Sequence, residues 1–116
     1  MAHKDIRILF EIEGRCYEAV GFLAEGELST NGDEMLRRAS AENGGAIKGE
    51  DEAFLRKRRA KIPRELDPYW LVTDVRDPGD PRDVSCFVWE SDRWYQSWNS
   101  LDDDWDDRCL VLRRCA

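Results

Sequence analysis

From residue 6 to residue 20 the sequence reads Ile-Arg-Ile-Leu-Phe-Glu-Ile-Glu-Gly-Arg-Cys-Tyr-Glu-Ala-Val. Apolar and charged side chains alternate through most of this stretch, which predicts half-buried β-strands. Glu13-Gly14 predicts a two-residue turn between them because glycine readily supplies the positive φ that such turns need. In this register Phe10 faces Tyr17, whereas a loop one residue later would set two glutamates opposite each other and destabilise the pair. The stretch therefore starts the fold as an antiparallel hairpin.

Two helices are expected after the hairpin. Thr30 or Asn31 can cap the first, and Asn43-Gly44-Gly45 ends it. Its apolar residues recur at helical spacing: Gly32, Met35, Leu36 and Ala39. The second helix is expected from Gly49-Glu50 to the residue before Pro63. Its apolar face comprises Phe54, Leu55 and Ile62.

Strand patterns return after the helices, in four segments: Tyr69–Val75, Val84–Trp89, Arg93–Trp98 and Arg108–Arg114. A length of 116 residues suits one domain, residues 1–116, with a single core. We therefore predict an α+β fold of order β-β-α-α-β-β-β-β, with an antiparallel sheet and both helices packed on one face. This order resembles that of many small bacterial and phage proteins, a likeness of architecture rather than of motifs.

Charge is distributed unevenly along the chain. Residues 53–64 hold six of the eighteen basic residues and no acidic one, so the net charge of −7 is a +6 segment within a −13 background. This segment predicts an anion-binding surface, with nucleic acid as one candidate ligand. Its candidate residues are Arg56, Lys57, Arg59 and Lys61. The alternative is a solvated helix whose terminal charges match its own dipole, with Glu50–Glu52 at the start. The acidic background opposes nucleic acid without excluding it.

Arg58 differs from its basic neighbours because it falls between Phe54 and Leu55 on the helical wheel. An arginine in an apolar face either extends its charged end to solvent or pairs with a buried carboxylate. Asp74, in an apolar strand, is the candidate partner. We expect Arg58 and Asp74 to form a structural ion pair.

The acidic segment before the last strand is the second candidate contact surface. It consists of Asp102, Asp103, Asp104, Trp105, Asp106 and Asp107. An EF-hand reading fails because Asp107 stands where that loop needs glycine and Arg113 where it needs glutamate. Trp105, in so charged a loop, is expected to be the most exposed tryptophan and to anchor a partner. Solvation as a plain acidic turn is the alternative.

Catalytic chemistry is not indicated. The one histidine, His3, lies near the start of the chain, and no Walker, GxGxxG, HExxH or GxSxG motif is present. The sequence predicts no enzyme, no cofactor and no metal site. An acid-catalysed reaction centred on Asp74 is the weakest hypothesis, since it needs a second carboxylate that the sequence does not place.

The cysteines have no metal-site spacing, and we expect four thiols, two or three of them in strands and partly buried. Cys109–Cys115 and Cys16–Cys86 are the disulfides left open. No signal peptide or apolar run near the ~20 residues of a membrane span is found, so a soluble, cytoplasmic protein without membrane contact is expected.

These observations favour a small acidic binding module, of inhibitor or immunity type, that occludes a basic protein partner. The alternative is the nucleic-acid or anion binder built on the basic segment.

Overall fold

The N-terminal hairpin forms in the predicted register. Strand β1 (Arg7–Ile12) pairs antiparallel with β2 (Arg15–Val20), and Phe10 lies opposite Tyr17. Their rings stack with centroids 5.7 Å apart. Both residues of the Glu13-Gly14 turn have positive φ, 48° and 84°, as a tight hairpin turn requires.

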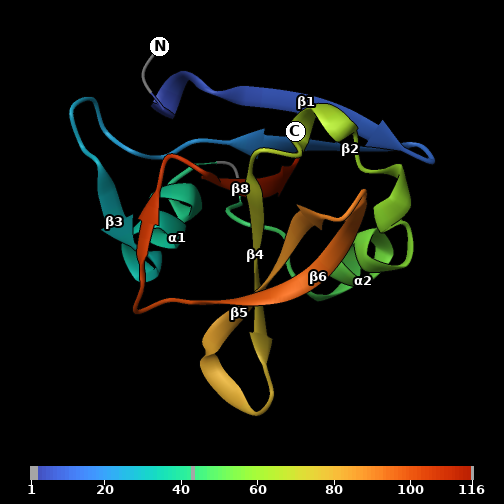
Figure 1. The fold of residues 1–116 in the computed structure, drawn as a ribbon. Coiled ribbons are helices and arrows are strands. Elements are labelled where there is room, and N and C mark those ends of the chain that lie inside the picture. Colours follow the sequence, from blue (N-terminus) through green and yellow to red (C-terminus); the bar gives the residue numbers. More distant parts are fainter. Residues whose placement is uncertain (1–2, 43, 116) are drawn as a thin grey trace.

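The fold is α+β, as predicted from the sequence. The computed structural model describes residues 3–42 and 44–115, and contains a six-stranded mixed sheet, a two-stranded sheet and two α-helices (Figure 1). The remaining strands and α-helices are β3 (Ser29–Asn31), α1 (Gly32–Ser40), α2 (Gly49–Lys57), β4 (Trp70–Asp77), β5 (Asp80–Glu90), β6 (Arg93–Ser100), β7 (Asp104–Asp106) and β8 (Cys109–Arg114). Three short 3-10 turns, η1 (His3–Asp5), η2 (Arg59–Lys61) and η3 (Arg64–Leu66), connect them.

The large sheet has the order β1-β2-β8-β4-β5-β6. Strands β4 and β8 run parallel, and the other pairs are antiparallel. The prediction of an antiparallel sheet is therefore wrong for one pair of strands, β4 and β8. After β6 the chain passes through β7 and returns between β2 and β4, so the last strand joins the two halves of the sheet.

The two helices cover opposite faces of this sheet, which corrects the expectation that they share one. Successive residues of a strand point to opposite faces. In β8, Val111 packs in one apolar cluster with α1, whereas Leu110 and Leu112 pack in the other with Leu55 of α2. Figure 1 accordingly shows α1 beside the β3–β7 pair and α2 on the other side of β4.

Helix α1 follows its prediction closely. Asn31 is the N-cap and accepts a hydrogen bond from the Glu34 amide at 2.9 Å. All four residues of the predicted apolar face are buried. The stop signal is tested only in part, because Asn43 lies outside the described residues. Gly44 and Gly45 have φ of 87° and 78°.

Helix α2 is shorter than expected. It ends at Lys57, and Arg58 leaves helical geometry with φ −116° and ψ 20°. The chain then forms η2 before Pro63. No helix in the described ranges is long and apolar enough to cross a membrane.

The acidic segment is not an exposed loop around a tryptophan. Asp104–Asp106 forms β7, which pairs antiparallel with β3. Trp105 is only 1% exposed and donates from Nε1 to the Ser100 carbonyl at 2.9 Å. A Cβ on Gly32 would approach the Trp105 ring to 2.6 Å. The expectation that Trp105 is exposed is wrong, because its strand faces the core and Gly32 leaves room for the indole.

A disulfide joins Cys16, in β2, to Cys115, just after β8. Neither pairing left open from the sequence forms, and Cys86 and Cys109 are buried free thiols. The disulfide lies at the end of the β2–β8 ladder, where the Cys115 amide also donates to the Cys16 carbonyl at 3.0 Å.

Candidate functional site

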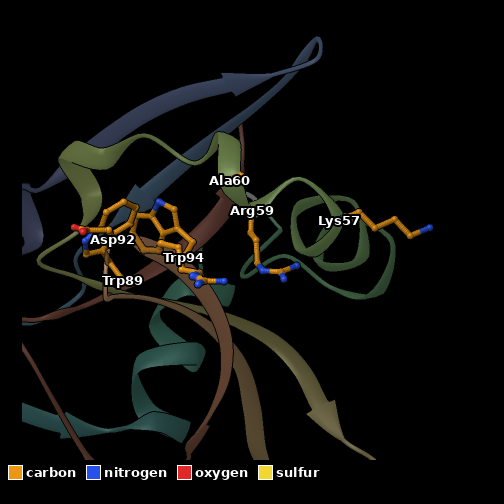
Figure 2. Close-up of a pocket in the computed structure, with 7 residues that line it drawn as sticks. Lys57, Arg59, Ala60, Trp89, Asp92 and Trp94 are labelled. Atoms are coloured by element: carbon orange, nitrogen blue, oxygen red, sulfur yellow. The ribbon is translucent and has the colours of Figure 1, made fainter.

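A cavity of about 370 Å³ lies between the basic segment and the β5–β6 hairpin (Figure 2). The end of α2 and η2 form one wall, and the hairpin forms the other. It is lined by Lys57, Arg59, Ala60, Trp89, Asp92, Arg93 and Trp94. We call it the basic–tryptophan pocket.

The cations of this pocket differ from most others in the protein. Thirteen of the eighteen lysines and arginines lie within 4.0 Å of a carboxylate. The five that have no such partner among the described residues are Lys4, Lys48, Lys57, Arg59 and Arg93. Three of these five line the pocket. The pocket thus gathers positive charge that the acidic protein does not neutralise through ion pairs.

Backbone structure positions these cations. Lys57 is the last residue of α2, and Figure 2 shows its side chain at the rim, extending away from the tryptophans. Arg59 belongs to η2 and donates from Nη1 to the Arg56 carbonyl at 2.8 Å. This bond engages one nitrogen of a guanidinium that carries five N–H donors. Arg93 starts β6, directly after the hairpin turn, and its guanidinium carbon lies 5.6 Å from the Tyr95 ring centroid.

Trp89 and Trp94 form the aromatic wall. They are directly opposed in the β5–β6 ladder, and their rings meet edge to face at 5.5 Å and 76°. Trp94 is 2% exposed and donates from Nε1 to the Ile62 carbonyl at 3.0 Å. This bond ties the hairpin to the end of the basic segment. Arg64 lies over the Trp89 ring at 5.3 Å. The hydrogen bond to Ile62 and the contact with Arg64 therefore fix the positions of the two tryptophan rings.

Asp92 is the one acidic residue of the lining. It follows Ser91 in the hairpin turn, and both residues have positive φ, 50° and 67°. No described cation pairs with its carboxylate. With three cations and one carboxylate, the lining has a formal charge of +2 within a chain of −7. Such local reversal of charge attracts anions at short range, within a Debye length of about 8 Å at physiological salt.

The four residues predicted to bind anions are divided by the fold. Lys57 and Arg59 line the pocket. Arg56 instead pairs with Glu52 at 3.2 Å, and Lys61 pairs with Glu13 at 2.7 Å. The phase of the helix decides this division, because Arg56 projects toward its i−4 neighbour while η2 turns Lys61 toward the β1–β2 turn.

The predicted ion pair between Arg58 and Asp74 does not form. Arg58 stacks on the Phe54 ring at 3.9 Å, and its Nε lies 3.1 Å from Glu13 Oε2 without hydrogen-bond geometry. Asp74 pairs with Arg76 at 3.0 Å. The end of α2 at Lys57 explains the difference, because Arg58 no longer lies in the apolar face of a continuous helix.

The acidic segment is partly neutralised by its own protein. Asp102 pairs with Arg82 at 2.6 Å, and Asp106 pairs with Arg108 at 3.1 Å. The other three, Asp103, Asp104 and Asp107, are exposed and have no ion pair with described residues. In the described ranges, no group of three or more histidine, cysteine or acidic side chains is arranged to hold a metal ion.

The histidine and the two free thiols are buried and have shifted pKa values. Burial lowers the pKa of His3. Burial also raises the pKa of the Cys86 and Cys109 thiols to about 12. A thiolate is the reactive form of cysteine, so both thiols are inert near neutral pH.

Sequence reasoning missed Arg93 and the pairing of Trp89 with Trp94. A signal was available: both tryptophans flank a short turn at positions that a two-residue hairpin places opposite each other. The contact between this hairpin and the basic segment has no such local signal.

No family model, no curated protein and no solved structure matches this chain.

Proposed function

We propose that this protein is a small binding module whose basic–tryptophan pocket takes an anionic ligand with an apolar or aromatic portion. The observation that carries the proposal is the gathering of Lys57, Arg59 and Arg93, which lack carboxylate partners among the described residues, in one pocket. Arg59 and Arg93 would hold a phosphate or carboxylate group through charge-assisted hydrogen bonds. The apolar portion would lie against Trp89 and Ala60.

A compact ligand is favoured over a long nucleic acid. The pocket volume of about 370 Å³ falls in the range of sites for small molecules. The overall charge of −7 repels an extended polyanion beyond the pocket. Binding rather than catalysis is favoured by the buried state of His3 and of the two free thiols.

The test is an NMR titration of the Trp indole and Arg side-chain signals with inorganic pyrophosphate and with thymidine 5′-monophosphate at low salt. The nucleotide is expected to bind more tightly than pyrophosphate because its base adds the aromatic contact. The double variant Arg59→Gln/Arg93→Gln should weaken binding roughly tenfold or more, since each charge-assisted hydrogen bond contributes about 1.5–3 kcal/mol.

The matched control is Lys4→Gln/Lys48→Gln, which removes the same net charge from two exposed cations outside the pocket. It should retain most of the affinity. Equal weakening by both double variants would show that only the overall charge of the protein affects binding. That result would contradict binding of the ligand in the basic–tryptophan pocket. A gel-shift series with an eight-nucleotide thymidine strand separates the ligand classes. Tighter binding of that strand, with a steep salt dependence, would identify nucleic acid as the ligand instead.

A second candidate function is occlusion of a basic protein partner by the acidic side of the molecule. It is favoured by crowding of carboxylates around Asp83. The pKa of Asp83 is raised by partial desolvation and then by repulsion from Asp80, Asp77 and the Asp102–Asp103 pair. Repulsion of this kind is relieved when a cationic surface approaches. Co-purification with a basic protein in a complex that dissociates at high salt would support this function. A chain that remains without any partner in native pull-downs would count against it.

A further inference from the structure

We infer that the acidic side carries a pocket built for one arginine side chain of a protein partner. A cavity of about 160 Å³ lies at the start of β4, between the end of β6 and the β7–β8 connection. Six residues that line it carry the argument: Trp70, Asn99, Asp103, Asp104, Asp106 and Arg108. We call it the Trp70 pocket. The inference rests on the second candidate function and is independent of the basic–tryptophan pocket.

The first observation is charge that the protein leaves unneutralised. Arg108, the cation of this lining, is engaged by Asp106 through two of its nitrogens, with Nε at 3.3 Å and Nη2 at 3.1 Å. Asp103 and Asp104 have no ion pair with any described residue. The lining therefore has a formal charge of −2, carried by the two carboxylates that are free to accept hydrogen bonds.

The second observation is Asn99, a buried polar side chain that lines the same cavity. Asn99 is 8% exposed, and its amide lies beside the Cys109 thiol. Its side-chain amide forms no other hydrogen bond in the described ranges, whereas its backbone pairs with Val84 in the β5–β6 ladder. Among the described residues, the fully buried side-chain atoms that lack a partner do not include either atom of this amide, so the amide remains accessible to a group that enters the cavity. An N–H donor that enters the cavity would satisfy the Asn99 carbonyl oxygen.

The third observation is Trp70. This residue lines the cavity and is 39% exposed, although its backbone lies within the β8–β4–β5 part of the sheet. An exposed tryptophan beside unpaired carboxylates suits a cation, which is attracted both to the ring face and to the negative charge. The three observations come from different strands and have one ligand chemistry in common.

Arginine fits this combination better than lysine. Its planar guanidinium stacks on an aromatic ring while its edge donates two parallel hydrogen bonds to carboxylates, and a further N–H remains for Asn99. Lysine offers a compact charge without the planar fork. The cavity volume admits the end of one side chain and no folded segment. The partner therefore presents an exposed arginine on its own surface.

The test uses ¹⁵N-labelled full chain titrated with N-acetyl-arginine methylamide, N-acetyl-lysine methylamide and capped hexa-arginine. The arginine compound should shift the Trp70 indole and the Asn99 side-chain amide signals, at lower concentration than the lysine compound. The double variant Asp103→Asn/Asp104→Asn should weaken binding roughly tenfold, the equivalent of one charge-assisted contact. Trp70→Leu should reduce the preference for arginine.

The control Glu11→Gln/Glu65→Gln removes equal charge from two exposed residues outside the pocket that have no ion pair with described residues. If hexa-arginine binds and both double variants weaken its binding equally, the assignment of the Trp70 pocket is wrong, while the proposed binding of a basic partner by the acidic side is retained. If hexa-arginine does not bind even at low salt, both fail. Equal affinity for the arginine and lysine compounds would overturn the arginine assignment.

Discussion

The guanidinium of Arg113 binds the carboxylate of Glu18 inside the protein, with Nε and Nη2 donating to Oε1 at 3.0 and 2.7 Å. The two residues are direct partners in the β2–β8 ladder, and the Arg113 side chain is 1% exposed. Arg7 adds a hydrogen bond at 2.7 Å to the other carboxylate oxygen. A charged pair thus joins the N-terminal hairpin to the last strand across 95 residues of sequence.

Removing the acid of this pair should destabilise the protein strongly. Glu18→Ala leaves the Arg113 charge buried without its partner, which costs about 3–5 kcal/mol. Urea denaturation followed by tryptophan fluorescence measures the loss. Arg7→Ala is the control, because Arg7 is half exposed and its ion pair contributes no more than about 1 kcal/mol. Equal losses for the two variants would contradict the assignment.

Loss of the disulfide should also lower stability. Cys16 and Cys115 are 99 residues apart, and cross-linking a loop of about 100 residues removes chain entropy equivalent to roughly 4.7 kcal/mol. We expect Cys16→Ser/Cys115→Ser to reduce the free energy of unfolding by up to this amount. Adding a reducing agent to the wild type should give the same shift and should leave the variant unchanged. A reductant that moves both proteins equally would show that the bridge is not the cause.

Gly32→Ala should be destabilising because the space for a side chain is already occupied. The added methyl group would lie 2.6 Å from Trp105 and 2.8 Å from the Leu101 backbone. Overpacking of this kind costs about 1–3 kcal/mol. Gly49→Ala, in the first turn of α2 with no atom within 4 Å of the new methyl, should be neutral or stabilise by up to about 1 kcal/mol. Thermal unfolding of the two variants makes the comparison.

Acid should destabilise the cluster around Arg38. Hydrogen bonds from Arg38 hold the pKa of Glu27 at about 2. Hydrogen bonds from Arg37 and then Arg38 hold the pKa of Glu34 at about 2. Because both values lie below the ordinary 4.5, their contribution is complete above pH 4.5 and is lost as the pH falls toward 2.

The measurement is the free energy of unfolding against pH for the wild type and for Arg38→Met. The variant should be less stable at neutral pH and should lose less stability than the wild type between pH 4.5 and 2. Parallel curves for the two proteins would contradict a role for Arg38 in this window.

The free thiols should resist alkylation until the protein unfolds. Burial raises the pKa of Cys86 and of Cys109 to about 12, so almost no thiolate forms at pH 8. Mass spectrometry after iodoacetamide treatment should detect no modification of the native protein and two modifications in urea without reductant. Rapid native labelling of either thiol would show that its site is open to solvent.

Much of the fold was predictable because it depends on local patterns. The hairpin register follows from alternation and from one glycine, and α1 follows from its cap and the spacing of Met35, Leu36 and Ala39. The strand segments were also placed to within a few residues, with the largest error at the start of β5. Within the site, Lys57 and Arg59 were recognisable from the charge of their segment.

The remaining features depend on which segments meet across the molecule. Insertion of β8 between β2 and β4 places the helices on opposite faces, buries the Glu18–Arg113 pair and brings Cys16 to Cys115. The residues of an apolar strand do not specify which strands will lie beside it. Several pairings would bury a similar apolar area and satisfy the same backbone hydrogen-bonding groups.

By itself, the sequence determined the N-terminal hairpin, α1, most of the strands of the large sheet and the uneven charge. Only the tertiary structure decided which charges are neutralised. It paired Arg56 and Lys61 with glutamates and left Lys57 and Arg59 in the lining of the basic–tryptophan pocket. It also buried Trp105 while exposing Trp70. Local periodicity fixes the face on which a side chain lies, but its exposure and its ionic partner depend on long-range packing of strands distant in sequence.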